Sequence, residues 1–230
     1  MNQKLVNINM PKLKVCGLTQ LQQIQELISM NIDFLGFIFY KKSPRYVLNH
    51  LSLEQLSTIK HNGKTGVFVN ENIEEITETA ERAKLNFIQL HGDEDENFIL
   101  ELRQKLNPEI EIIKVIRIGN QNPDELQKII NNQPAAVNYL LFDTDSKAFG
   151  GTGKTFNWNL LNEIEIRLPY FLSGGISEEN IQNTNLLHPR PFALDVNSKF
   201  EMEPGIKDLE RIKMLKNTIK SIESRRDDLQ

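Results

Sequence analysis

Eight short apolar runs alternate with longer amphipathic segments along this 230-residue chain, and this alternation constrains the fold more than any other feature of the sequence. The runs are rich in β-branched and aromatic residues and have the length of β-strands. They cover residues 13–18, 34–39, 66–69, 87–90, 112–118, 139–142, 170–172 and 192–196. The pattern predicts eight strands separated by helices.

The segments between the runs carry apolar residues at helical spacing, as the first segment does at Leu21, Ile24 and Leu27. Segments 157–166 and 178–187 predict short helices, and residues 206–222 predict the last helix. Residues that commonly cap helices precede four of the segments, namely Asn70, Asp93, Thr155 and Ser177.

Eight strand–helix units within about 210 residues match a (β/α)8 barrel, or TIM barrel, at the compact end of its size range. We therefore predict an α/β protein with a single barrel domain over residues 12–222, an N-terminal extension over 1–11 and a charged C-terminal tail over 223–230. An open doubly wound sheet is the alternative, because it has the same alternation. Its dinucleotide-binding form would place G-x-G-x-x-G after the first strand, and this sequence has none there.

Composition excludes several classes of protein. The net charge of −4 and the scattered lysines and arginines provide no basic patch, so we expect no nucleic-acid partner. The single cysteine excludes an internal disulfide and indicates a reducing compartment, the cytoplasm. Residues 1–10 are too polar for a signal peptide, and the longest nearly apolar run, 34–40, is too short to span a membrane. We expect a soluble protein with no membrane partner, and a monomer rather than a dimer.

A carboxylate and a glycine-rich loop follow the sixth strand. Asp143 stands at the end of that run, and residues 150–153 contain three glycines. The loop ends in Gly-Lys-Thr like a phosphate-binding P-loop, but the first glycine of that motif would fall at Ala148, so we set aside a nucleoside triphosphatase. Because active groups of a barrel lie at the carboxyl ends of its strands, and a glycine-rich loop is costly to order, Asp143 and this loop are candidates for function.

Three further strand ends carry groups suited to chemistry. Cys16 ends the first strand, and a buried cysteine that acts as a small hydrophobe is the alternative interpretation. Arg45 lies in the basic loop 41–46, which is either a solvated turn or a cationic clamp for a carboxylate or phosphate. His91 ends the fourth strand, either as a structural hydrogen-bonding group or as a ligand contact.

The loops after the seventh and eighth strands are small and polar. In a barrel, amides in these loops commonly bind phosphate, helped by a helix N-terminus such as the one expected at Ser177. The candidate phosphate-binding residues are Ser173, Gly174, Gly175, Asn197, Ser198 and Lys199. The four histidines are dispersed, and none pairs with another His or Cys at ligand spacing, so we expect no metal site. A thiol and a carboxylic acid at one barrel mouth suit proton transfer on a sugar phosphate, which indicates an isomerase.

Taken together, the strand ends resemble the phosphoribosylanthranilate isomerase family of tryptophan biosynthesis. The resemblance covers residues 12–222, and its most specific parts are the Cys-Gly block and the glycine-rich loop that ends in Lys-Thr-Phe. The matching blocks are KVCGLT at 14–19, GFIFY at 36–40 with SPRY at 43–46, GVFVN at 66–70, QLHG at 89–92, LFDT at 141–144, GGTGKTF at 150–156, LSGGI at 172–176, and Asp195.

The resemblance implies an Amadori rearrangement of N-(5-phosphoribosyl)anthranilate to 1-(2-carboxyphenylamino)-1-deoxyribulose 5-phosphate, a phosphorylated sugar-anthranilate substrate and no cofactor or metal. By matching positions, Asp143 would be the general acid that protonates the furanose ring oxygen. Cys16 would be the general base that removes the C2 proton, and Arg45 would hold the anthranilate carboxylate. Two further substrate contacts and one further phosphate contact are expected at His91, Asp195 and Gly153.

Two expectations and two alternatives complete this interpretation. Cys16 can act as a base only if cationic neighbours such as Lys14 lower its pKa. Lys199 stands where the family commonly has glycine, and we expect its charge to substitute for an amide contact. Another phosphate-binding barrel enzyme of tryptophan or histidine biosynthesis would keep the Ser-Gly-Gly loop with a different acid–base pair. A non-catalytic barrel would be expected to lose Cys16 or Asp143, and both are present.

Overall fold

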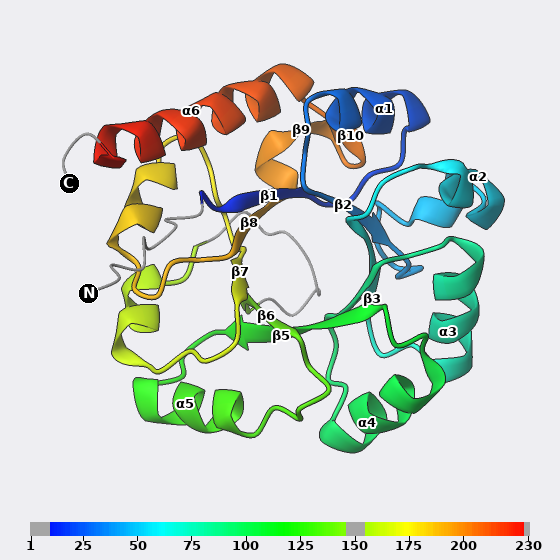
Figure 1. Cartoon of the computed structure of the whole chain (residues 1–230), viewed down its shortest axis with the longest axis horizontal. Coiled ribbons are helices and arrows are strands. Elements are labelled where there is room, and N and C mark those ends of the chain that lie inside the picture. The colour runs from blue at the N-terminus through cyan, green and yellow to red at the C-terminus, as the bar shows by residue number, and fades with distance from the viewer. Residues whose placement is uncertain (1–9, 146–154, 228–230) are drawn as a thin grey trace, which may run out of the picture.

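The computed structural model describes residues 10–145 and 155–227 of the chain. Eight parallel strands form a closed barrel in the order of the sequence, and helices surround it on the outside (Figure 1). The strands are β1 (Lys12–Val15), β2 (Phe34–Ile38), β3 (Lys64–Phe68), β4 (Phe87–Leu90), β5 (Glu111–Ile118), β6 (Tyr139–Thr144), β7 (Tyr170–Leu172) and β8 (Ala193–Val196). The predicted (β/α)8 barrel is confirmed, because β1 pairs with both β2 and β8 and the sheet has no open edge.

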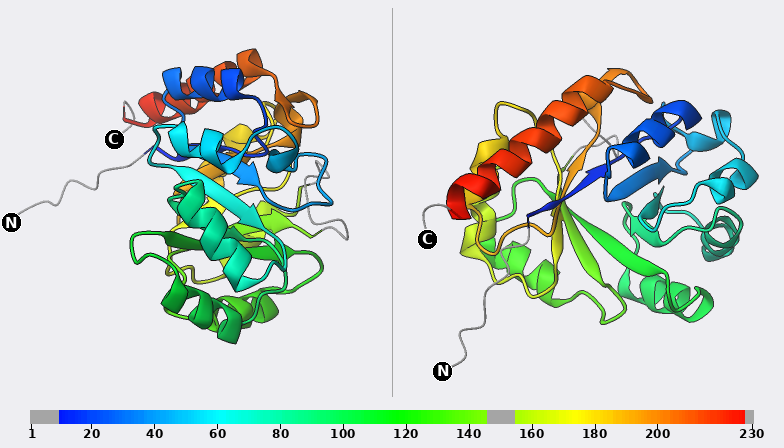
Figure 2. Two further views of the ribbon diagram at one scale, coloured as in Figure 1. Left: turned by 90° about the vertical axis from the view of Figure 1, so that its right-hand side faces the viewer. Right: turned by 45° about the horizontal axis from the view of Figure 1, so that its top comes forward.

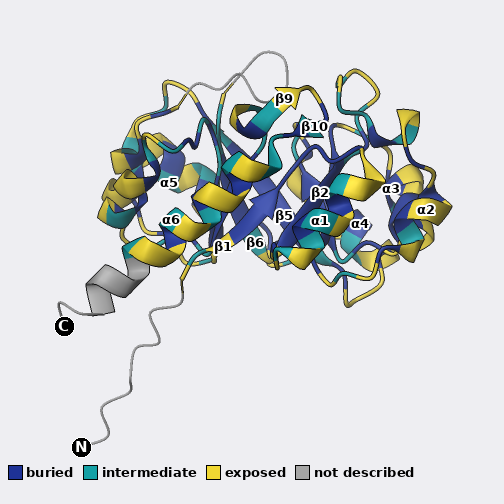
Figure 3. Cartoon of the chain, turned by 90° about the horizontal axis from the view of Figure 1, so that it is seen from above, coloured by how far each residue is buried: buried dark blue, intermediate teal, exposed yellow. Residues whose placement is uncertain are grey.

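Within the described residues, six α-helices pack against the outer face of the barrel, with exposed residues turned to solvent and buried residues turned to the strands (Figures 2 and 3). They are α1 (Leu21–Ser29), α2 (Leu53–Thr58), α3 (Ile73–Arg82), α4 (Glu96–Lys105), α5 (Pro123–Asn131) and α6 (Leu209–Asp227). A capping box of Asn122 and Glu125 starts α5, and its first residue is Pro123, whose fixed φ suits a helix start. No helix in the described part of the chain is long and apolar enough to cross a membrane.

The predicted caps of α3 and α4, Asn70 and Asp93, lie two residues before the residues that cap these helices in the structure. The side chains that cap α3 and α4 belong to Asn72 and Asp95, which accept the N–H groups of Glu75 and Phe98. Asn70 instead has a φ of +49°, a left-handed conformation that an N-cap residue does not take. Its side chain accepts a hydrogen bond from the N–H of Asp93, so the two expected caps bond to each other.

The described residues contain four short 3-10 helices, and two of them take the place of an α-helix between strands. η2 (Trp158–Glu163) and η3 (Ile181–Leu186) follow β6 and β7, as the short sixth and seventh segments predicted. Asn157, rather than the expected Thr155, caps η2 by accepting the N–H of Asn159. The other two are η1 (Val47–Asn49), after β2, and η4 (Ser198–Phe200), after β8.

The last helix differs from the prediction at both ends. Residues 206 and 207 form β10 (Ile206–Lys207), which pairs with β9 (Glu201–Glu203) in a two-stranded antiparallel hairpin at the rim of the barrel. The helix therefore begins at Leu209, because the hairpin uses the residues expected to open it. It continues to Asp227, past the residue 222 at which we expected it to end.

Aromatic side chains fill the amino-terminal end of the barrel interior. Phe34 packs edge-on against Phe87 and Phe171, with ring centroids 5.2 and 5.1 Å apart. Tyr139 and Phe192 extend the same cluster. Because large apolar rings occupy this end, the polar groups of the barrel interior gather at the carboxyl ends of the strands.

Candidate active site

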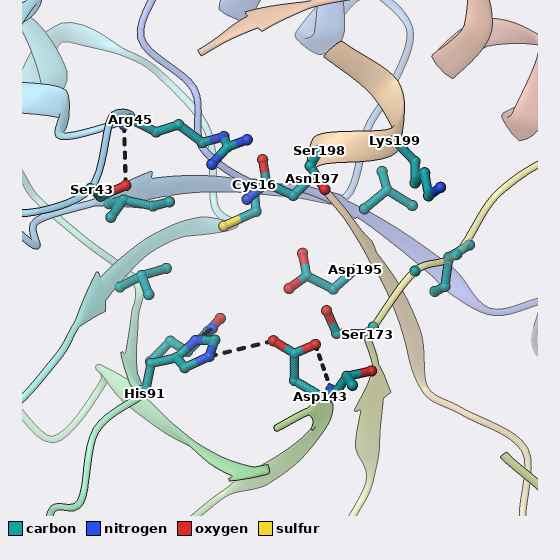
Figure 4. Close-up of a pocket in the computed structure, with 18 of the residues that line it drawn as sticks. Cys16, Ser43, Arg45, His91, Asp143, Ser173, Asp195, Asn197, Ser198 and Lys199 are labelled. Atoms are coloured by element: carbon teal, nitrogen blue, oxygen red, sulfur yellow. Dashed lines mark hydrogen bonds and ion pairs between the residues drawn. The ribbon is translucent and has the colours of Figure 1, made fainter. Parts of the chain in front are cut away.

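A pocket opens at the carboxyl ends of the strands and holds the residues that the sequence analysis singled out (Figure 4). Gly153 lies outside the described residues. The other predicted residues all line this one pocket: Cys16, Arg45, His91, Asp143, Ser173, Gly174, Gly175, Asp195, Asn197, Ser198 and Lys199.

Cys16 comes directly after β1, and its side chain is almost fully buried, with 5% of the residue exposed. Gly36 on β2 makes room for the thiol, since a β-carbon there would lie 2.7 Å from Sγ. The expectation of a lowered pKa is wrong: burial raises the pKa of Cys16, and the charge of Asp195 adds to this, although Lys14 and Lys207 act in the opposite direction. The thiol is therefore neutral in the resting protein near pH 7.

Lys14 on β1 is completely buried, and it contacts two residues that line the pocket. Its ammonium group donates to Asp195 Oδ2 and to Gln89 Oε1, both at 2.9 Å. Burial opposes the charge of Lys14, but Asp195 and Cys16 raise its pKa above the ordinary value. Lys14 therefore stays charged, as the anchor of two neighbouring polar side chains. The period of two along a strand places Lys14 and Cys16 on the same face, which is the sequence signal for their proximity.

Asp195 on β8 has one oxygen without a partner. Its Oδ1 is buried and forms no hydrogen bond with the described residues, while Oδ2 is held by Lys14. Burial raises the pKa of Asp195 against the opposing charge of Lys14, and the nearby Asp143 raises it further. A ligand that brings a donor to Oδ1 would satisfy this oxygen.

Asp143 stands near the end of β6 and faces the pocket with 15% of its side chain exposed. Its Oδ1 accepts the N–H of Thr144 at 2.8 Å, and its Oδ2 lies 3.4 Å from His91 Nε2. Gly174 approaches closely, since a β-carbon there would lie 3.2 Å from Asp143 Oδ1 and 2.5 Å from Thr144 Oγ1. Its φ of +83° also favours glycine, so both space and conformation require this residue.

Arg45 makes a bidentate ion pair with Glu201, a residue that the sequence analysis did not single out. Arg45 Nη2 donates to Glu201 Oε2 at 2.6 Å, and Nε donates to the same carboxylate at 2.9 Å. Lys207, completely buried, donates to Glu201 Oε1 at 2.6 Å and to Asn197 Oδ1 at 2.8 Å. Burial disfavours the charged carboxylate, but Arg45 and Lys207 together hold the pKa of Glu201 below its ordinary value. The β9–β10 hairpin thus supplies the groups that position Arg45.

The predicted phosphate loops lie on one side of the pocket (Figure 4). Gly174 and Gly175 both have positive φ angles, of +83° and +72°, which turn the backbone sharply after β7. The prediction that a helix starts at Ser177 is wrong. Its N–H is held by Asn180 Oδ1 at 2.8 Å, and η3 begins only at Ile181. The loop after β8 continues into η4, which carries the exposed Lys199.

No group of three or more His, Cys, Asp or Glu side chains in the described ranges could hold a metal ion. The polar groups of the pocket instead divide by position. The guanidinium of Arg45 lies at one side and Ser173 and Lys199 lie at the other, with the thiol of Cys16 and the carboxyl group of Asp143 between these two sides (Figure 4). Such a site suits proton transfer to and from a substrate with an anionic group at each end.

Fold and site together define a (β/α)8-barrel isomerase. The sequence model of the N-(5'-phosphoribosyl)anthranilate (PRA) isomerase family matches residues 13–218. The chain belongs to this family.

Individual relatives agree with the family match. The sequence is 38% identical to the N-(5'-phosphoribosyl)anthranilate isomerase of Parabacteroides distasonis over 205 residues, which is 87% of this chain and 90% of that protein. The crystal structure of phosphoribosyl anthranilate isomerase from Thermotoga maritima has a TM-score of 0.73 at 33% identity, with coverage of 92% and 100%. A phosphoribosyl anthranilate isomerase in complex with reduced 1-(o-carboxyphenylamino)-1-deoxyribulose 5-phosphate has a TM-score of 0.70 at 31% identity, with coverage of 94% and 100%.

Proposed function

We infer that this protein catalyses the Amadori rearrangement of N-(5'-phosphoribosyl)anthranilate to 1-(2-carboxyphenylamino)-1-deoxyribulose 5-phosphate in tryptophan biosynthesis. The observation that carries this function is the presence of Cys16 and Asp143 in one pocket, between separate positions for two anionic groups. The substrate has an anthranilate carboxylate at one end and a phosphate at the other. Family membership favours this reaction over the other barrel enzymes that the sequence left open.

We propose that Asp143 starts the reaction as a general acid. Asp143 gives its proton to the furanose ring oxygen while the bond from C1 to that oxygen breaks. The lone pair of the anthranilate nitrogen then forms a C=N bond to C1. Asp143 is left as a carboxylate, and two donors, the N–H of Thr144 and the ring of His91, lie beside its oxygens.

Cys16 completes the proton transfer as the general base. The thiolate takes the proton from C2, the electrons of the C–H bond form a C1=C2 double bond, and the C=N electrons return to nitrogen. The product of this step is the enol form of the amino ketose, an isomer of the substrate. Lys14 and Lys207 favour the thiolate that this step needs, although burial disfavours it.

The neutral resting thiol has to lose its proton before it can act as the base. Burial opposes this loss, and the positive charges of Lys14 and Lys207 favour it.

Three contacts would hold the substrate. We propose that Arg45 binds the anthranilate carboxylate, with the guanidinium held in place by Glu201. Asp195 Oδ1 would accept a substrate N–H or O–H, which fits its buried position without a partner among the described residues. The turn at Gly174 and Gly175 would bind the phosphate together with Ser173, Asn197, Ser198 and Lys199, whose ammonium adds charge that glycine would lack.

The reaction moves protons within one molecule and leaves its overall oxidation state unchanged, so we propose that it needs no cofactor. We also propose a cytoplasmic enzyme, because a reducing compartment keeps its only cysteine a free thiol. We also propose a monomer as the working unit. Light scattering coupled to gel filtration measures the mass, and a particle of twice 26.6 kDa at assay concentration would contradict the monomer.

Complementation tests the function directly. The gene should restore growth without tryptophan to an auxotroph that lacks phosphoribosylanthranilate isomerase, and the purified protein should convert the substrate. Cys16→Ala and Asp143→Asn should each lower kcat by at least about 10² to 10⁴ with the fold intact by circular dichroism. Near-normal turnover by Cys16→Ala would show that the thiol only packs. Failure of the wild-type gene to complement and of the pure protein to turn over would refute the function itself.

A further inference from the structure

Four polar side chains form a chain of contacts across the barrel from β1 to β6. Lys14 Nζ lies 2.9 Å from Gln89 Oε1, Gln89 Nε2 lies 3.2 Å from His91 Nδ1, and His91 Nε2 lies 3.4 Å from Asp143 Oδ2. Gln89 lies on β4 and is only 2% exposed, and His91 comes directly after that strand. The chain links Lys14, which contacts Cys16, to the carboxyl group of Asp143.

Lys14 determines which way the Gln89 amide points. An ammonium group can only donate hydrogen bonds, so the group of Gln89 that faces Lys14 has to be the carbonyl oxygen. The NH2 group is consequently directed at the other neighbour, His91 Nδ1. A reversed amide would set its NH2 group against the buried ammonium of Lys14. Lys14 would then keep only Asp195 as an acceptor, and the NH2 group would face a donor, which is costly at a fully buried position.

The orientation of Gln89 in turn determines the proton position on His91. Nδ1 faces an amide donor, so it has to be the unprotonated, accepting nitrogen of the ring. A neutral imidazole carries one proton, which then resides on Nε2, the nitrogen that faces Asp143. We propose that Gln89, held by Lys14, is a positioning residue that fixes His91 as the Nε2–H tautomer and so directs a hydrogen-bond donor at Asp143.

This arrangement matters at the moment when Asp143 gives up its proton, and in this respect it rests on the proposed function. The N–H of Thr144 already donates to Oδ1, and the Nε2–H of His91 would donate to Oδ2, so both carboxylate oxygens gain a donor. The distance of 3.4 Å is long for a hydrogen bond, and such bonds in unliganded sites commonly shorten when substrate binds. The opposite tautomer would present a lone pair to the new charge.

The protein contains its own reference for the expected tautomer. His61 Nδ1 accepts the backbone N–H of Gly63 at 3.0 Å, and His61 Nε2 lies 2.9 Å from the backbone oxygen of Ile32. A backbone N–H only donates and a carbonyl only accepts, so His61 is the Nε2–H tautomer without any assumption about an amide side chain. His61 lies at the opposite, amino-terminal end of the barrel, where changes at Gln89 do not reach it.

Nitrogen NMR of the histidine rings tests the proposal on the wild-type protein. In a sample with 15N-labelled histidine at pH 7.5, long-range 1H–15N correlations report which ring nitrogen carries the proton. The resonances of His91 are assigned by their loss in His91→Gln. The expected spectrum shows His91 with an unprotonated Nδ1 and a protonated Nε2, as for His61. A proton on Nδ1, or on both nitrogens, would overturn the proposal.

Gln89→Glu tests the cause. An ionised carboxylate accepts from Lys14 but cannot donate to His91, so the proton of His91 should move to Nδ1 while the spectrum of His61 stays unchanged. Turnover should fall about tenfold to a hundredfold, part of the roughly 10² to 10⁴ that an acid contributes. KM should stay within about threefold of the wild-type value. Gln104→Glu on exposed α4 is the control for added negative charge and should change neither property.

Gln89→Met is a second variant, for use if the buried glutamate of Gln89→Glu impairs folding. A methionine side chain neither donates a hydrogen bond to His91 nor accepts one from it. This variant should leave a mixture of both His91 tautomers. A His91 spectrum that stays purely Nε2–H in both variants would refute the role of Gln89. The tautomer is measured without substrate, so this result is independent of the function. If Asp143→Asn keeps full turnover while the tautomer shifts as expected, the role of Asp143 fails and the positioning by Gln89 stands.

Discussion

The carboxylate of Glu201 pairs with two cations that are largely shielded from solvent, and its removal should destabilise the protein measurably. The side chains of Arg45, Glu201 and Lys207 are 12%, 4% and 0% exposed, so Glu201→Gln removes the carboxylate that both positive charges share. Loss of one partner of a buried ion pair costs about 3–5 kcal/mol. Because glutamine still offers one oxygen as acceptor, we expect a loss near the lower end, about 3 kcal/mol in the free energy of unfolding.

The measurement is thermal unfolding at pH 7 with Glu178→Gln as the matched control. Glu178 pairs with Arg211 in the same bidentate geometry, at 2.9 and 2.7 Å, but the two side chains are 33% and 40% exposed. A pair this exposed contributes at most about 1 kcal/mol. For a chain of this size, about 3 kcal/mol corresponds to a Tm lower by roughly 6–12 °C. A decrease for Glu201→Gln no larger than that for Glu178→Gln would refute the reasoning.

The same substitution has a defined pH dependence. The folded-state pKa of Glu201 lies below its unfolded value, so its contribution to stability is present above the unfolded pKa of about 4.3 and is lost as pH falls through the folded value. The Tm difference between wild type and Glu201→Gln should therefore be full at pH 7 and shrink below about pH 4. A difference that stays constant into the acid range would show that the glutamate acts through packing alone.

Three further predictions concern the pocket. Arg45→Lys should lower kcat/KM by an amount equivalent to roughly 1.5–3 kcal/mol, because an ammonium group cannot reproduce bidentate pairing; unchanged steady-state kinetics would assign the carboxylate contact to another group. Lys199→Ala should raise KM with a smaller effect on kcat, since holding a phosphate is largely uniform binding, and an unaltered KM would show that Lys199 does not contact it. Alkylation of Cys16, the only thiol in the sequence, should be slower than that of free cysteine at pH 7, because burial raises the pKa of Cys16. The alkylation rate should keep rising with pH to above about 8.5, and a plateau below pH 8 would contradict a raised pKa.

The barrel could be predicted because each strand is a short apolar run, and few folds have eight such runs separated by helices. Cys16, His91 and Asp143 could be found for a related reason: each stands at or near the carboxyl end of a strand, and in a barrel all those ends meet. Sequence position alone was sufficient there. The helix caps were placed two residues early because local polarity does not distinguish a cap from a left-handed turn residue such as Asn70.

Glu201 and Lys207 could not be found in this way. They lie in the β9–β10 hairpin, after the strands have ended, and their role depends on the chain folding back over Arg45. Gln89 is a polar residue within an apolar strand, and its role becomes clear only from its hydrogen bond with Lys14 across the barrel. The predicted direction of the Cys16 pKa shift was wrong, because nearby cations can be inferred from the sequence, whereas the degree of burial cannot.

The ion pair between Lys14 and Asp195 joins the first and last barrel strands, and its two residues are 181 positions apart. During synthesis at about 5–20 residues per second, Asp195 follows Lys14 by roughly 9–36 s. Throughout that interval β1 lacks its partner strand β8, and the ammonium group of Lys14 lacks the carboxylate of Asp195. Activity therefore appears only when translation is nearly finished. Any truncated chain that stops before β8 lacks both the pairing of β1 with β8 and the complete site.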